Sequence, residues 1–327
     1  MSESDVKVSV VVCTYNGEKY LREQLRSILD QTRPADEIVV SDDGSTDSTL
    51  EIIAELSSGA GRTGTPLWNV QKRKRPMGVS GNFASALAKA QGEFIALADQ
   101  DDVWEPDRLE KSLVLFRDGV LLTHSDATLI DAAGEATGTL MSALRLTRSE
   151  RESLSTGNAL EVLLRRNVVT GATVMIRSGL LQQALPIPNG WIHDEWIALV
   201  AAAQGGVVFS ADSLVRYRQH GSNEIGATKT DYDEAKRRLQ EKRTDFFRRK
   251  LLRNEGIATM VAKQPQWLGS VHSAALSAKV EFDQWRSQLP TVRIWRILPV
   301  IRRWAKGDYG RFARGFIDVI RDVALTG

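Results

Sequence analysis

Over the first 120 residues, short apolar runs rich in β-branched residues alternate with segments whose apolar residues recur at helical spacing. The runs predict strands at 6–16, 36–47, 66–71 and 93–98, the second of them breaking into a turn. The helical spacing predicts helices at 17–32, 48–56, 78–91 and 105–116. This alternation with short connections predicts a mostly parallel sheet covered by helices on both faces.

Beyond residue 118 the pattern is less regular. It predicts strands at 119–131, 206–211 and 213–218, a strand followed by a helix within 168–185, and a helix at 193–205. From about residue 228 the chain is helical in character, with no strand signal. We therefore predict an α/β domain over residues 1–227 and a helical, basic C-terminal region over residues 228–327.

Three of the predicted strands end in polar residues that are typical of binding sites. Thr14, Tyr15 and Asn16 follow the first strand, Asp42 and Asp43 follow the second, and the run 99–102 follows the fourth. In an open α/β sheet, ligands bind outside the carboxyl ends of the parallel strands. These side chains are therefore expected to gather along one edge of the sheet.

Composition and charge narrow the class of protein. The 327 residues are 42% hydrophobic, which is enough for a substantial core, and the single cysteine excludes an internal disulfide. The N-terminus has no secretion signal, and no run approaches the roughly 18 apolar residues of a spanning helix. We expect a cytoplasmic protein, either soluble or peripheral at the inner face of the plasma membrane.

Charge is distributed unevenly along the chain. Residues 1–228 hold 22 Lys and Arg against 30 Asp and Glu, whereas residues 229–327 hold 21 against 11. An acidic body suggests that one part handles a cation. A basic end suggests contact with an anionic surface or a solvated helical face.

The acidic run 99–102 suggests a metal site. Asp99 and Asp101 stand two residues apart, and Mg²⁺ or Mn²⁺ often binds one or two carboxylates together with substrate phosphates. His220 is a candidate metal or phosphate ligand, and Arg216 or Arg218 is a candidate to neutralise a leaving diphosphate. The alternative is a loop of solvated acids that caps the next helix, but the position after a buried strand favours the metal.

Two further groups suggest a nucleotide site and a proton acceptor. Asp42 and Asp43 can accept hydrogen bonds from a ribose or a base, and Tyr15 offers a ring for stacking. An Asp-Gly turn and a partly buried tyrosine are the alternatives. Asp194 and Glu195 open a predicted helix, where acids stabilise the positive helix end. A carboxylate there can also act as a general base.

Four stretches together resemble the family 2 glycosyltransferases, which are inverting enzymes with the nucleotide-sugar fold called GT-A. They read "VSVVVCTYNGEKYLREQLRSILDQT", "EIVVSDDGSTDST", "GEFIALADQDDVWEPDRLEK" and "GWIHDEWIALVAAAQGGVVFSADSLVRYRQHGSN". Their order and spacing agree with the family as well as their composition. The resemblance implies a GT-A catalytic domain with a mixed, mostly parallel sheet flanked by helices.

The forms "DQDDVW" and "HDEWIAL" are most similar to bacterial transferases that add rhamnose or similar sugars during surface-polysaccharide synthesis, an activity of the cell envelope. The Gln-x-x-Arg-Trp motif of processive synthases is absent, which favours addition of one sugar at a time. The implied partners are a nucleotide-sugar donor, dTDP-rhamnose or a UDP-sugar, and a glycan or lipid-linked acceptor.

The resemblance also implies roles for individual residues. Asp101 would bind the Mn²⁺ or Mg²⁺ that bridges the donor's diphosphate, and Asp194 would deprotonate the acceptor, with Glu195 as the other candidate base. The predicted nucleotide-sugar site consists of Thr14, Tyr15, Asn16, Asp42, Asp43, Asn82, Asp99, Gln100 and Arg218. The predicted metal site consists of Asp99, Asp101 and His220.

Residues 291–327 interleave eight Arg and Lys with Trp295, Trp304 and Phe312. This pattern fits a helix lying on an anionic membrane surface, and it fits equally a helix packed on the body or in a homodimer interface. Nucleic-acid binding is not expected, because the basic residues are spread over separate helices without a recognition motif.

Two other functions would use the same strand-end site. A sugar nucleotidyltransferase would need a basic phosphate loop near the N-terminus, but "TYNGEKY" has Lys19 without the expected Gly-rich, Arg-rich form. A non-catalytic nucleotide-sugar-binding scaffold would not need both Asp101 and Asp194.

Overall fold

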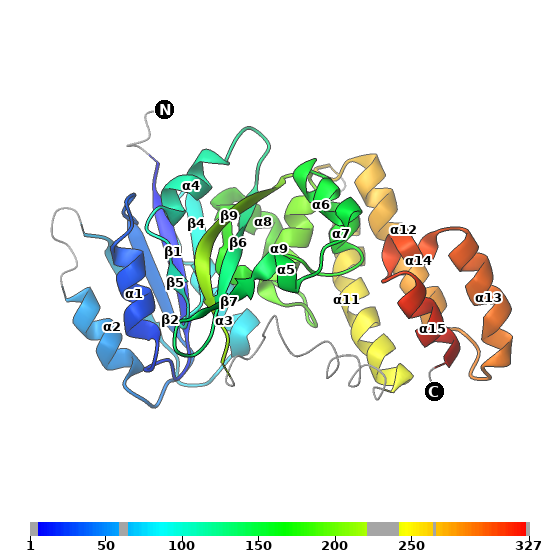
Figure 1. Ribbon diagram of the computed structural model, residues 1–327, viewed down its shortest axis with the longest axis horizontal. Helices are drawn as coiled ribbons and strands as arrows, with labels where there is room; N and C mark the ends of the chain where they lie inside the picture. Colours follow the sequence, from blue (N-terminus) through cyan, green and yellow to red (C-terminus); the bar gives the residue numbers. More distant parts are fainter. Residues whose placement is uncertain (1–5, 59–64, 221–241, 264–265, 325–327) are drawn as a thin grey trace.

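The computed structural model describes residues 6–58, 65–220, 242–263 and 266–324 (Figure 1). The strands are β1 Val8–Thr14, β2 Glu37–Asp42, β3 Leu67–Lys72, β4 Phe94–Ala98, β5 Val103–Trp104, β6 Leu122–Ile130, β7 Ala136–Thr139, β8 Val174–Arg177 and β9 Val207–Arg218. The α-helices before residue 221 are α1 Leu21–Leu29, α2 Thr49–Ser57, α3 Gly78–Leu87, α4 Arg108–Val114, α5 Leu140–Ala143, α6 Arg148–Ser155, α7 Ala159–Leu163, α8 Leu181–Ala184 and α9 His193–Ala202. Those after residue 241 are α11 Arg243–Lys263, α12 Ser270–Ser287, α13 Ile294–Ala305, α14 Asp308–Phe312 and α15 Phe316–Ala324.

The strands form one nine-stranded sheet in the order β3-β2-β1-β4-β8-β6-β9-β5, with β7 beside β6. The first four strands of that order pair in parallel, β8 is antiparallel to both β4 and β6, and β9 is parallel to β6. The predicted mixed, mostly parallel sheet flanked by helices is therefore confirmed.

Helices cover both faces of the central strand β1. Successive side chains of β1 therefore pack alternately into two hydrophobic cores. Val10 and Val12 pack in the core that contains Leu21 and Leu25 of α1, whereas Val11 packs in the core that contains α3 and α9. An uninterrupted valine run is typical of a parallel strand buried on both sides.

The predicted convergence at one edge of the sheet is present. In the β1–β2 register Thr14 lies beside Asp42, and in the β1–β4 register Val12 lies beside Ala98. The residues that follow these parallel strands therefore emerge together, which places the segments beginning at Tyr15, Asp43 and Asp99 around one site.

The C-terminal helices pack onto the hydrophobic core that contains α3 and α9, and they do not form a separate core. Ile257 and Met260 of α11, and Leu276 and Phe282 of α12, belong to the same apolar cluster as α9. Figure 1 shows α12 to α15 at the end of the molecule opposite α1 and α2. The predicted boundary at residue 228 lies outside the described residues, so the two-part division stays a prediction.

The chain between residues 119 and 218 differs from its prediction in two places. The strands expected at 206–211 and 213–218 are one strand, β9, whose register against β6 shifts near Asp126. The strand followed by a helix that was predicted within 168–185 is present as β8 and α8, after a 3₁₀ turn at Gly171–Thr173. Strand β7 and helices α5 to α7 have no counterpart in the predicted elements.

Candidate functional site

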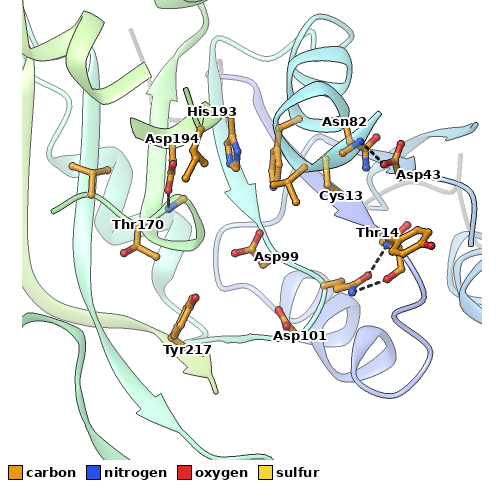
Figure 2. A pocket seen from close by; sticks show the side chains of 18 of the residues that line it. Cys13, Thr14, Asp43, Asn82, Asp99, Asp101, Thr170, His193, Asp194 and Tyr217 are labelled. Carbon is orange, nitrogen blue, oxygen red and sulfur yellow. Dashed lines mark hydrogen bonds between the residues drawn. The ribbon is translucent and has the colours of Figure 1, made fainter. Parts of the chain in front are cut away.

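A cavity of about 610 Å³ opens at the carboxyl ends of β1, β2 and β4 (Figure 2). Eight of the residues predicted from the sequence line it: Thr14, Tyr15, Asp43, Asn82, Asp99, Gln100, Asp101 and Asp194. The segment 167–171, His193 and Tyr217 complete much of the opposite wall. The volume is within the range of small-molecule and cofactor sites.

Gln100 holds the backbone of Tyr15 at the entrance. Its side-chain oxygen accepts from the Tyr15 N–H at 2.8 Å, and its amide donates to the Tyr15 carbonyl at 3.1 Å. The Tyr15 side chain is 52% exposed, which leaves a ring available at the rim. A fixed and exposed aromatic ring is suited to stacking with a planar ligand.

Asp43 and Asn82 form a polar part of the cavity wall near the start of α3. Both carboxylate oxygens of Asp43 accept from the Met77 N–H, and one also accepts from the Gly78 N–H at 2.9 Å, which ties the start of α3 to the end of β2. Asn82 donates to the Ser41 carbonyl at 2.8 Å. Its side-chain oxygen is buried and has no hydrogen-bond partner among the described residues.

The acidic run carries more negative charge than the surrounding protein neutralises. Burial, together with the charges of Asp101 and Asp194, raises the pKa of Asp99 to about 7. Burial, together with the charges of Asp101 and Asp99, raises the pKa of Asp102 as well. The cation that opposes these shifts is Arg108, which lies against the Trp104 ring and donates to the Leu97 carbonyl. A bound cation is therefore favoured electrostatically here.

Asp194 faces the cavity from the first turn of α9. Its carboxylate accepts from the Gly171 N–H at 2.8 Å and from the Glu195 N–H at 2.6 Å. Burial raises its pKa to about 6, against the opposing effect of these two backbone hydrogen bonds. A carboxylate with such a pKa is suited to accept a proton near neutral pH.

His193 and Gly171 shape the wall around Asp194. The His193 ring stacks on Phe83 with centroids 3.8 Å apart, and burial lowers its pKa to about 3, so the ring is neutral. Neither ring nitrogen has a hydrogen-bond partner in the described part of the chain. A side chain at Gly171 would meet His193 at 3.1 Å, which explains the glycine. An isolated glycine in a strand-like run is the signal that could have marked this close approach.

Glu195, the other predicted base, is directed away from the cavity. Its carboxylate pairs with Arg253 of α11 at 2.5 Å. The same arginine stacks over the Trp191 ring at 3.9 Å, and its carbonyl accepts from the Trp191 indole at 3.0 Å. The Glu195 carboxylate therefore fastens the start of α9 to α11. This contact favours Asp194 as the base, and the choice between the two acids stays a prediction.

Three residues predicted to contact the donor have structural partners and lie outside the cavity lining of the described residues. Asp42 is buried and accepts from Thr14 and from the Ser45 backbone. Asn16 accepts from the Thr46 N–H at 2.9 Å. Arg218 is 3% exposed, because its guanidinium donates to Glu23 and to the Asp101 carbonyl. Arg218 therefore braces the acidic run, and its contact with the donor stays a prediction.

The predicted three-residue metal set is not assembled around one point. His220 lies against Asp101 with Nε2 and Oδ2 2.8 Å apart, whereas Asp99 lies between Asp101 and Asp194 (Figure 2). No three His, Cys, Asp or Glu side chains of the described residues gather closely enough to enclose a metal. The carboxylates still fit a hard divalent cation that completes its coordination with substrate phosphates.

Comparison with known proteins agrees with the family that the sequence motifs resemble. The family model described as glycosyl transferase family 2 matches residues 9–129. An uncharacterized glycosyltransferase of Nostoc sp. is 30% identical over 241 residues, which cover 71% of this chain and 71% of that protein. The chain belongs to the family 2 glycosyltransferases.

Two solved structures show that this family 2 glycosyltransferase has the GT-A architecture. TarS from S. aureus in complex with UDP-GlcNAc superposes with a TM-score of 0.55 at 20% identity, over 85% of this chain and 72% of that one. A mannosyltransferase from Pyrobaculum calidifontis in complex with GDP-Man and Mn²⁺ superposes with a TM-score of 0.53 at 16% identity, over 92% and 75%. The predicted family and fold are therefore confirmed.

Proposed function

We propose that this glycosyltransferase moves one sugar from a nucleotide-diphosphate sugar to a hydroxyl group of a glycan or lipid-linked acceptor, with inversion at the anomeric carbon. The observation that carries the proposal is the placement of Asp101 and Asp194 on the wall of one cavity, with Asp99 between them. A single displacement needs stabilisation of the leaving diphosphate on one side and a base on the other.

Each wall of the cavity has a part in the proposed reaction. The Tyr15 ring stacks on the nucleotide base, and Asn82 and Asp43 line the part of the cavity that holds the donor. Asp194 takes the proton from the acceptor hydroxyl as the bond to the anomeric carbon forms and the bond to the diphosphate breaks. Asp101, with Asp99 nearby, would hold the divalent cation. When bound, Mn²⁺ or Mg²⁺ supplies positive charge that stabilises the leaving diphosphate.

The identity of the donor is the finer part of the proposal. The resemblance to rhamnosyltransferases of surface-polysaccharide synthesis puts dTDP-rhamnose first and a UDP-sugar second. The complexes of the two structural neighbours support a nucleotide sugar as the class of donor and add UDP-GlcNAc and GDP-Man to the candidates. The Mn²⁺ in one of them supports a divalent cation.

A panel of nucleotide sugars tests the proposal. The correct donor at about 100 times its Kd, with Mn²⁺ present, should stabilise the fold by about 2.7 kcal/mol in a thermal-shift assay. The same donor should release its nucleoside diphosphate when an acceptor glycan is added. Pyrophosphate release from a nucleoside triphosphate would instead identify a nucleotidyltransferase, and binding without any turnover would identify a scaffold.

The rate of transfer should depend on pH through Asp194. The base acts only when ionised, so kcat/KM should rise with pH and reach half its maximum at about pH 6, where burial has placed the pKa of this carboxylate. Initial rates with saturating metal, measured on both sides of that pH, check this. A rate that is flat across this range, or that falls as pH rises through it, contradicts the role of Asp194.

A further inference from the structure

Helices α13 and α15 have their apolar faces turned outward. Trp295 is 69% exposed and Leu298 57% exposed, and Ile301 and Trp304 of the same helix are exposed as well. On α15, Phe316 and Ile317 are exposed as well. The rings of Trp304 and Phe316 lie 5.9 Å apart, which joins the two faces into one surface. We call these six residues the α13–α15 apolar surface.

Three charged residues of the same helices, Arg296, Asp318 and Asp322, are buried while these apolar residues are exposed. Arg296 of α13 is fully buried and donates to the backbone of residues 290 and 291. Asp322 of α15 is buried and accepts from Arg286 at 2.6 Å and from the Tyr309 hydroxyl at 2.7 Å. An amphipathic helix in water buries its apolar side and exposes its charges. The opposite orientation indicates that the outer face meets an apolar medium.

The exposed charges around this surface are all basic. Arg293, Arg302, Lys306 and Arg311 are exposed, whereas no acidic residue in 291–324 is. Asp308 pairs with Arg303, and Asp318 pairs with Arg286. A two-fold contact between copies of the chain would bring this patch against itself and oppose basic groups with basic groups. Anionic lipid headgroups complement the same charges.

We infer that the α13–α15 apolar surface docks this protein on an anionic lipid membrane. The apolar side chains enter the boundary between headgroups and acyl chains, the two exposed tryptophans lie at headgroup depth, and the arginines and lysine contact lipid phosphates. Contact is peripheral in the described chain, where no helix is both long enough and apolar enough to cross a bilayer. The inference does not depend on the proposed reaction, because binding needs neither donor nor acceptor.

Sedimentation with lipid vesicles tests the inference on the full chain. The protein should bind vesicles of equimolar phosphatidylglycerol and phosphatidylcholine, bind vesicles of phosphatidylcholine alone about tenfold or more weakly, and dissociate at high salt. Leu298→Asp should weaken binding to the anionic vesicles about tenfold or more. The matched control is Leu67→Asp. Leu67 lies on β3, is 65% exposed and is distant in sequence from α13 and α15. This variant should bind the anionic vesicles as the parent does.

Two further measurements keep the result unambiguous. Brominated phosphatidylcholine mixed into the anionic vesicles should quench tryptophan fluorescence of the unmodified protein, which removes dependence on the folding of a variant. Light scattering without vesicles reports the oligomeric state. Equal binding to both vesicle types, unchanged binding by Leu298→Asp, or a dimer that Leu298→Asp splits would each overturn the inference, the last in favour of a second copy as the occupant.

Discussion

Replacing Asp194 with asparagine should lower kcat by about 10²–10⁴-fold, the range typical of general-base catalysis, and should leave donor affinity unchanged. The reason is that Asp194 reaches the cavity but lies apart from Tyr15 and Asn82, where the nucleotide is proposed to bind. Steady-state kinetics with acceptor, together with calorimetric titration of the donor, measure both quantities. Asparagine leaves one of the two N–H groups that face this side chain without an acceptor, so the melting temperature of the variant is measured alongside.

The neighbouring acid supplies the matched control. Glu195→Gln has the same loss of charge one residue away, but it breaks the ion pair with Arg253 and removes nothing from the cavity. Its kcat should stay within a few-fold of the parent, because a partly exposed ion pair contributes about 0–1 kcal/mol. If Glu195→Gln were the inactive variant and Asp194→Asn the active one, the assignment of the base would be wrong.

Removing divalent cations with EDTA should lower the transfer rate by about 10²–10³-fold, because the Lewis-acid contribution of several kcal/mol is lost and each 1.36 kcal/mol is about tenfold. Added Mn²⁺ or Mg²⁺ should restore it. Asp101→Asn should need a higher metal concentration for the same rate, since it removes a charge from the cluster that favours the cation.

Asp118→Asn is the control for the loss of one acidic charge, because Asp118 is exposed and lies outside the cavity lining. Its metal requirement should equal that of the parent. Full activity in EDTA, or an unchanged metal requirement for Asp101→Asn, would show that the acidic run serves the fold and not the leaving group.

The sequence alone determined the framework of this site. Strand and helix periods are local properties, and parallel strands joined by helices leave their carboxyl ends at one edge. Tyr15, Asp43 and Asp99 could therefore be placed together before any coordinates. The motifs around Asp101 and Asp194 added the family and both walls of the cavity.

Only the tertiary structure decided what each polar side chain contacts. Asp194 and Glu195 are adjacent in sequence, but successive helix residues point about 100° apart, and α11 packs on one of those directions. Arg218 and His220 look equally available from the sequence. In the fold they contact Glu23, Tyr20 and Asp101, and the sequence separation of these contacts reaches nearly 200 residues. Only the folded chain brings such distant residues together.

The last helices show the same division. The spacing of apolar and basic residues in 294–305 determined an amphipathic helix, but amphipathicity does not say which face is turned inward. The buried cluster of Arg286, Tyr309 and Asp322 provides the partners that charged groups need inside a protein, so Asp322 and the neighbouring Arg296 pack inward while the α13–α15 apolar surface remains outside. That choice depends on partners contributed by several helices, and no local pattern contains it.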